Sequence, residues 1–132
     1  MEDAKYLPGV FDRIKAVFID TVLLVLISYI LALLFENLEV TSQTIRILVF
    51  VVIFVLYDPV FTSQLGGTIG HTMIGIAVRN TETNRNISFF NALLRFIFKS
   101  LLGWISLLTV GNSEKKQAIH DKIAKSWVIY TT

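Results

Sequence analysis

Two long apolar runs dominate the first half of the chain. Residues 13–35 and 47–65 consist mainly of Leu, Ile, Val, Phe and Ala. At ~1.5 Å per residue, each run is long enough to cross a hydrocarbon layer of about 30 Å as one helix. A short polar loop at residues 36–46 separates them. The pattern therefore predicts two membrane-spanning helices that run in opposite directions.

A third apolar run, residues 92–110, is harder to assign because it contains Arg95 and Lys99 on one helical face. Each cation costs about 2.5 to 3.5 kcal/mol at the bilayer centre, which nearly cancels the gain from the apolar residues. Most remaining Lys and Arg residues follow residue 66, and basic loops favour the cytoplasm. We therefore expect two full spans, both termini in the cytoplasm and an interfacial or re-entrant third helix. Three full spans is the alternative.

Glycine-rich turn signals and β-prone residues lie outside the apolar runs. They predict an all-α integral membrane protein that carries a small cytoplasmic β-hairpin within residues 66–91. The tail, residues 111–132, is also expected to be cytoplasmic, and its β-prone residues 127–131 are expected to pair with residues 74–79. Residues 1–12 read as an interfacial lead-in to the first span. The whole chain, 1–132, is then one membrane domain.

Composition supports a membrane protein and excludes several other classes. The chain is 54% hydrophobic and only 17% charged, which is too apolar for an ordinary soluble domain of 132 residues. It has no Cys, so it can form neither a disulfide nor a thiolate metal site. A net charge of +2 fits cytoplasm-facing basic residues better than nucleic-acid binding. No residue pattern suggests an enzyme or a cofactor.

Each predicted span contains one acid, and the two acids lie at similar depths. Asp20 is six residues, or ~9 Å, inside the first span, and Asp58 is seven residues, or ~10 Å, from the same edge. Pro59 also frees a backbone carbonyl in the second span. The nearby hydroxyl side chains that can add oxygen atoms are Thr21, Ser28, Thr62 and Ser63. These groups predict an oxygen-lined site for Na⁺ or a proton.

Such a site can exchange ions, because burial disfavours two ionised carboxylates and an entering Na⁺ favours them, expelling a shared proton. A structural role is the competing interpretation. Asp20 can instead be locked by Arg13 or Arg95 from another helix. Arg13 lies about 10 Å from Asp20 along the same helix, so each is expected to meet a different helix. Arg95 and Lys99 of the third apolar run are the candidate partners for an acid, and Arg13, Arg95, Lys99 and Asp121 are the predicted ion-pairing or gating residues. His71 and His120 lack metal-ligand spacing, and we expect polar interfacial roles for them.

Several of these residues occur in an order that resembles the RDD family of bacterial membrane proteins, which is named for an arginine and two aspartates. The matching features are Arg13 and Asp20, the segment TIGHTMIGIAV, Arg95, and the tail IHDKIAKSWVIY. Asp121 matches an aspartate typical of the family tail. Either Asp121 or Asp58 is the second named aspartate. His71 and the pair Lys125 and Ser126 depart from the family pattern.

The resemblance implies a transport role, since some members of the family look like sodium/proton antiporters. Two or three helices cannot enclose a pathway, so a transporter would be a homodimer or higher homo-oligomer in the lipid bilayer. The alternative is a scaffold or assembly factor whose acids pair helices. A third possibility is a sensor in which His120 and Asp121 titrate near neutral pH.

Overall fold

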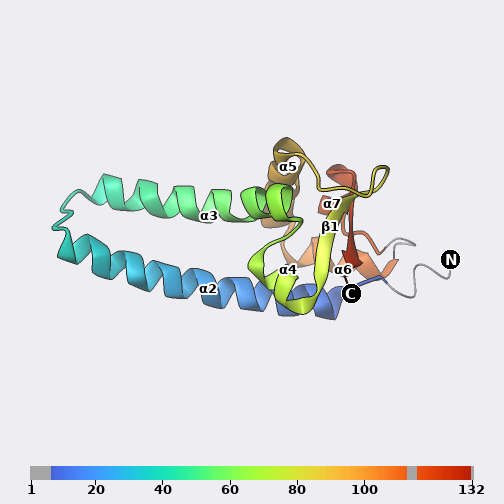
Figure 1. Cartoon of the computed structure of the whole chain (residues 1–132), viewed down its shortest axis with the longest axis horizontal. Coiled ribbons are helices and arrows are strands. Elements are labelled where there is room, and N and C mark those ends of the chain that lie inside the picture. The colour runs from blue at the N-terminus through green and yellow to red at the C-terminus, as the bar shows by residue number, and fades with distance from the viewer. Residues whose placement is uncertain (1–6, 113–115, 132) are drawn as a thin grey trace.

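The computed structural model describes residues 7–112 and 116–131. Two long helices, α2 (Val10–Asn37) and α3 (Gln43–Leu65), extend side by side and are joined at one end by a short loop. The elements that follow gather at the other end, beside the start of α2 and the end of α3 (Figure 1). We call this group, residues 66–112 and 116–131, the head.

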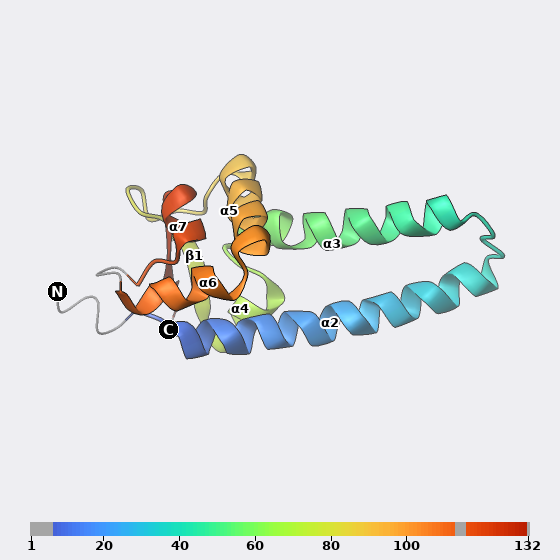
Figure 2. The same cartoon turned by 180° about the vertical axis from the view of Figure 1, so that it is seen from behind.

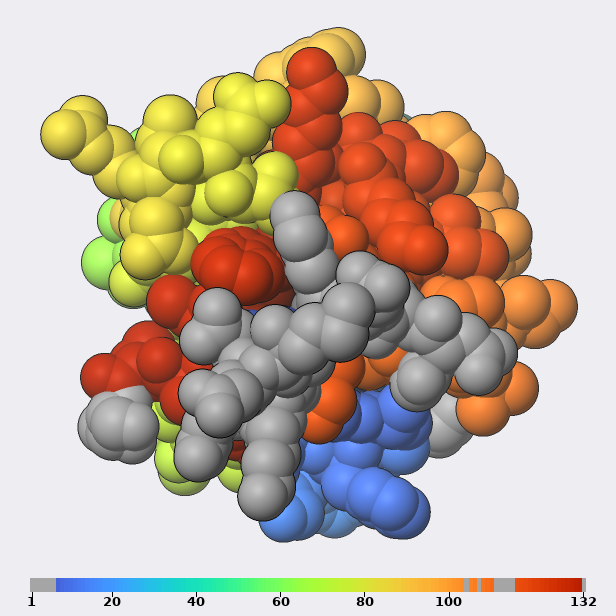
Figure 3. Space-filling model, turned by 90° about the vertical axis from the view of Figure 1, so that its right-hand side faces the viewer, coloured from blue at the N-terminus to red at the C-terminus, as the bar shows by residue number. Residues whose placement is uncertain are grey.

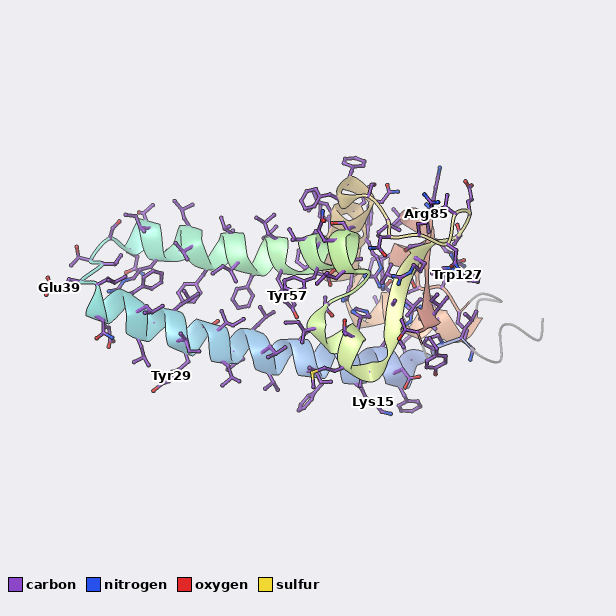
Figure 4. The ribbon with its side chains drawn as sticks, in the orientation of Figure 1. Lys15, Tyr29, Glu39, Tyr57, Arg85 and Trp127 are labelled. Atoms are coloured by element: carbon purple, nitrogen blue, oxygen red, sulfur yellow. The ribbon has the colours of Figure 1, made fainter. Side chains whose placement is uncertain are left out.

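The surfaces of α2 and α3 are apolar and exposed along most of their length. In the most apolar 18 residues of each helix, only 6% and 11% of the residues are buried. Exposed side chains include Phe18, Leu26 and Tyr29 on α2 and Leu48 and Val52 on α3. Figure 4 shows Tyr29 pointing away from α3. Within the described residues, these two helices are long and apolar enough to cross a membrane.

A short helix and a strand begin the head. Thr68 caps the N-terminus of α4 (Ile69–Ile74), which ends at Gly75 with φ +86°. Strand β1 (Ile76–Asn80) then pairs antiparallel with β2 (Ser126–Tyr130), and Val78 lies opposite Val128. The predicted pairing of residues 74–79 with residues 127–131 is therefore confirmed, and the observed strands differ from these bounds by one or two residues. The expected hairpin within residues 66–91 is wrong, because the cap at Thr68 and the left-handed Gly75 make residues 69–74 helical.

The third apolar run is not one helix. It divides at Gly103, where φ is +54°, into α5 (Phe89–Leu102) and α6 (Trp104–Leu108), followed by the 3₁₀ helix η1 (Thr109–Asn112). Helix α5 has 14 residues, or about 21 Å, which is less than the thickness of a hydrocarbon layer. It packs against the end of α3 and lies across the axis of that helix (Figure 2).

The small helix α7 (Ile119–Ile123) leads into β2 and completes the head. A small core holds the head against α2, and it consists of Ala16, Ile76, Val78, Ile87, Ala92 and Val128. Seen end-on in Figure 3, the loop after β1, the tail and the beginning of α2 all contribute to the same face. The head is therefore held to the start of α2 by a core drawn from distant segments of sequence.

Candidate functional site

A cavity of about 140 Å³ lies where α2, α3 and α5 meet. This volume is well above the ~10 to 15 Å³ that one water molecule needs. Its wall is formed by Val17, Asp20, Thr21, Leu24, Phe54, Tyr57, Asp58, Phe96 and Lys99. Both intramembrane acids that the sequence singled out therefore face one cavity from two different helices. The cavity also contains a lysine that the predicted oxygen-lined site did not include.

Asp20 is held by neutral hydrogen-bond donors and not by a basic residue. Its Oδ1 accepts from the hydroxyl of Tyr57 at 2.7 Å and from the backbone N–H of Gly70 at 2.8 Å. Its Oδ2 accepts from the hydroxyl of Thr68 at 2.6 Å. Figure 4 shows Tyr57 projecting from α3 toward α2. The expected alternative, in which Arg13 or Arg95 locks Asp20, is therefore wrong.

The close approach of α4 to α2 explains how Asp20 gains these donors. A Cβ atom at Gly70 would lie 2.2 Å from the carbonyl oxygen of Ala16 and 2.8 Å from Cγ of Asp20. Only glycine allows this approach without a backbone shift. The Nδ1 atom of His71 lies 2.6 Å from the Thr68 hydroxyl, which fixes that hydroxyl beside Asp20. The start of α4 thus forms one side of the Asp20 site.

Asp58, in contrast, lies among positive charges. Its Oδ2 is 3.3 Å from Nζ of Lys99, and its Oδ1 is 3.9 Å from Nη1 of Arg95. The hydroxyl of Thr62 donates to Oδ1 at 3.1 Å. Arg95 and Lys99 are one helical turn apart on α5, so the same face brings both cations to Asp58. These contacts stabilise the ionised form of the carboxylate.

A second ionic cluster, formed by Arg13, Arg95 and Asp121, connects the tail to α2 and α5. Nη1 of Arg13 lies 2.5 Å from Oδ2 of Asp121, and Nε of Arg95 lies 3.0 Å from Oδ1. Arg13 also donates to the carbonyl oxygen of Lys116 at 2.7 Å. All three charged side chains are almost completely buried. Arg95 reaches both Asp121 and Asp58, so it links this cluster to the cavity.

The four hydroxyl residues predicted at the site behave differently from one another. Thr21 lines the cavity, but its hydroxyl donates to the carbonyl oxygen of Val17 in its own helix. Thr62 binds Asp58. Ser28 and Ser63 donate to carbonyl oxygens in their own helices, and neither lines the cavity. The prediction that Ser28 and Ser63 lie at the site is therefore wrong.

The two histidines are buried among protein side chains in the head. Burial, assisted by Arg95, lowers the pKa of His71 to about 3. Burial and Arg95 also lower the pKa of His120 to about 3, although nearby Asp121 opposes the shift. Burial would raise the pKa of Asp121, but Arg13 and Arg95 hold it well below its usual range. These pKa values contradict a sensor that titrates His120 and Asp121 near neutral pH.

These pKa values predict that acid destabilises the protein before its carboxylates titrate. In the unfolded chain the histidines have an ordinary pKa of about 6.5, so the unfolded state binds protons first as the pH falls. Stability is fully present above that pH and declines between pH 6.5 and 3, by up to ~1.4 kcal/mol per pH unit for each histidine. Thermal unfolding in detergent between pH 7.5 and 4.5 measures this decline.

His120→Gln should lower the melting temperature at pH 7.5. The change of melting temperature per pH unit should also fall to about half of the wild-type value, because one of the two titrating histidines remains. Loss of the Asp121 contribution begins only below about pH 4, outside this range. A wild-type melting temperature that stays constant from pH 7.5 to 4.5 would contradict the assignment of neutral, buried histidines.

Sequence reasoning missed Tyr57 and Thr68, the two side chains that donate to Asp20. The sequence contained a signal for Tyr57, because a phenolic hydroxyl within an apolar span needs a hydrogen-bond partner. It also contained a signal for Thr68, because threonine directly before a short helix is a common N-cap. No sequence signal showed that α4 folds back onto α2. Among the described residues, no group of three His, Asp or Glu side chains could hold a metal ion.

Comparisons with known proteins identify the family of the chain. The model of the RDD family matches residues 7–125. An uncharacterized protein of Bacillus subtilis (strain 168), YxaI, is 26% identical over 147 residues, and the match covers 92% of this chain and 96% of that protein. No solved structure matches the chain. The family match includes the residues of both the cavity and the Arg13, Arg95 and Asp121 cluster.

Proposed function

The chain belongs to the RDD family, and we propose that it exchanges a monovalent cation for a proton across a membrane, at the cavity between Asp20 and Asp58. One observation carries this proposal: acids from two apolar helices face the same cavity. A carboxylate inside a membrane is costly and is usually retained for ion binding. Asp20 has no basic partner among the described residues, so it is the carboxylate that a cation would neutralise.

The orientation in the membrane follows from charge and shape. We place α2 and α3 across the bilayer, with the head and both termini on the cytoplasmic side, where the positive-inside rule favours its Lys and Arg residues. Helix α5 then lies along the interface, because it is short and crosses the axis of α3. Its exposed apolar residues Phe90, Ile97 and Leu101 would enter the lipid. The cavity opens near the cytoplasmic surface.

A second copy is needed to complete a pathway. The two long helices touch each other over only a small part of their length, and most of their apolar surface is exposed. Two helices cannot surround a water-filled passage from the cavity to the opposite face of the membrane. We therefore propose a homodimer or higher homo-oligomer, in which α2 and α3 of neighbouring copies enclose the passage.

The test is proton flux in liposomes that contain the purified protein and a pH-sensitive dye. A gradient of NaCl, LiCl or KCl is imposed, and choline chloride serves as the control for ionic strength. We expect at least one alkali cation to drive proton movement faster than choline does, because the methyl groups of choline keep its charge away from carboxylate oxygens. Equal rates for all four salts, and equal to protein-free liposomes, would contradict exchange.

One observation favours a scaffold as the second candidate function. Every buried acid in the described part of the chain binds a partner from another element, so each can act as an interhelical connection. A scaffold would use the exposed basic residues of the head, such as Lys122 and Lys125, to bind anionic lipid or a partner protein. It would show no cation-driven proton flux in the same liposomes.

A further inference from the structure

We infer that Lys99 carries the exchanged proton: its ammonium group pairs with Asp58, and a monovalent cation that enters the cavity between Asp20 and Asp58 displaces it with loss of its proton. This inference rests on the proposed function and identifies the group that couples the two ions. It replaces the mechanism expected from the sequence, in which the two carboxylates share a proton.

Hydrogen-bond donors surround the carboxylate of Asp20. Three groups donate to its two oxygens: the hydroxyls of Tyr57 and Thr68 and the backbone N–H of Gly70. An ionised carboxylate only accepts hydrogen bonds, whereas a protonated one must also donate. With the single hydroxyl hydrogen of Thr68 directed to Asp20 and not to Nδ1 of His71, these three donors match the ionised state. Asp20 is ready to receive a cation as it stands.

Asp58 is surrounded by a different set of groups, two of them cationic, which favour its ionised form. It accepts from Thr62 and Lys99, and the guanidinium of Arg95 lies nearby. Arg95 cannot be the proton carrier, because a guanidinium stays charged in proteins. Lys99 remains, with Nζ 3.3 Å from Asp58 and a side chain that is 21% exposed toward the cavity. Lysine is a compact charge that can lose its proton when its surroundings change.

Arg95 is positioned to take the place of Lys99. Its Nη1 atom is buried, has no hydrogen-bond partner and lies 3.9 Å from Oδ1 of Asp58. A buried N–H without a partner is costly, and a small movement would bring it within hydrogen-bond distance. When Lys99 leaves, Asp58 therefore keeps one positive partner. This second donor removes part of the cost of displacing Lys99.

The exchange balances in atoms and charge. One monovalent cation enters the cavity, the ammonium of Lys99 becomes a neutral amine, and the released proton passes to water. The net charge of the cavity does not change, so one cation is exchanged for one proton. The charged and titratable groups that act on Lys99 are Asp58 and Tyr57 from α3, Asp20 from α2, Arg95 from α5, His71 from α4 and His120 from α7.

Calorimetric titration of the purified protein with NaCl, LiCl and KCl tests this inference. Titrations in buffers of different ionisation enthalpy count the protons released per cation bound. We expect about one proton per cation for the wild type, and a Kd that weakens about tenfold for each unit of pH decrease. Lys99→Gln should bind the cation without proton release and with a Kd independent of pH.

Lys99→Arg separates the charge of the side chain from its proton. Arginine can keep the ion pair with Asp58 and so protect the fold, but it cannot release a proton. This variant should bind the cation more weakly than the wild type does, again without proton release. Lys122→Gln, on an exposed face of α7, is the matched control and should behave as the wild type.

The outcomes distinguish this inference from the proposed function. Binding that still releases about one proton in both Lys99 variants would overturn the role of Lys99 and leave cation exchange intact. Tyr57→Phe then identifies whether the phenol supplies the proton. Wild-type protein that binds none of the three cations would instead overturn the proposed function, and the role of Lys99 with it.

Discussion

Replacing Asp121 by asparagine should destabilise the folded protein by about 3 to 5 kcal/mol, because it removes one partner of a buried ionic cluster. The guanidinium groups of Arg13 and Arg95 would remain buried, with a neutral amide in place of the carboxylate between them. The N–H group of Ala118, which now donates to Asp121, would also lose a charged acceptor. Thermal unfolding in detergent, followed by circular dichroism, measures the loss.

Asp12→Asn is the matched control for this substitution. Asp12 lies on α2 next to Arg13, but its carboxylate is partly exposed and pairs with Lys15 at 3.8 Å. It also accepts from the hydroxyl of Tyr130. An exposed ion pair of this kind contributes about 0 to 1 kcal/mol. If Asp121→Asn melts no lower than Asp12→Asn, the buried cluster does not hold the head to the helices.

A double variant tests whether Asp121 acts through Arg13. Arg13→Gln alone leaves Asp121 with one guanidinium, and Asp121→Asn alone leaves Arg13 without a carboxylate and Arg95 with Asp58 alone. Together they should cost less than the sum of the single changes, because each removes a charge that the other leaves unpaired. Additive losses would show that the two residues stabilise the fold independently.

The sequence predicted those features of the site that are set within a single helix, namely the depth of a residue and the face on which it lies. Residue spacing placed Asp20 and Asp58 at a similar depth, and the structure brings them to one cavity. The same spacing put Arg95 and Lys99 on one face, where both reach Asp58. Helical periodicity determines depth and face directly, so these features needed no knowledge of the tertiary fold.

The partners of each acid could not be predicted, because they come from segments far away in the sequence. Asp20 binds Thr68 and Gly70, which follow it by 48 and 50 residues. Arg13 binds Asp121, 108 residues later. Composition and spacing do not show which of several polar groups will meet across helices. The helical α4 was missed for another reason: six residues between a cap and a glycine carry too little periodicity to separate helix from strand.

The most direct test of the cavity is Asp20→Asn, which should reduce cation-driven proton flux to the level of protein-free liposomes. A carboxylate ~4 Å from a monovalent cation contributes about 4 kcal/mol at an effective dielectric constant of ~20, equivalent to roughly a thousandfold in affinity. Asparagine keeps the size of the side chain but loses this attraction. The flux assay with Na⁺, Li⁺ and K⁺ measures the effect.

Because asparagine also weakens the hydrogen bonds to Asp20, a second variant must separate stability from ion binding. Tyr57→Phe removes one donor to Asp20 and leaves its charge in place, so both variants should lose about 1 to 3 kcal/mol of stability. Only Asp20→Asn should abolish flux. A scaffold would show no flux in the wild type or in either variant, with losses confined to melting temperature. Flux that persists in Asp20→Asn would place the ion pathway elsewhere, because no other acid in the described part of the cavity wall lacks a basic partner.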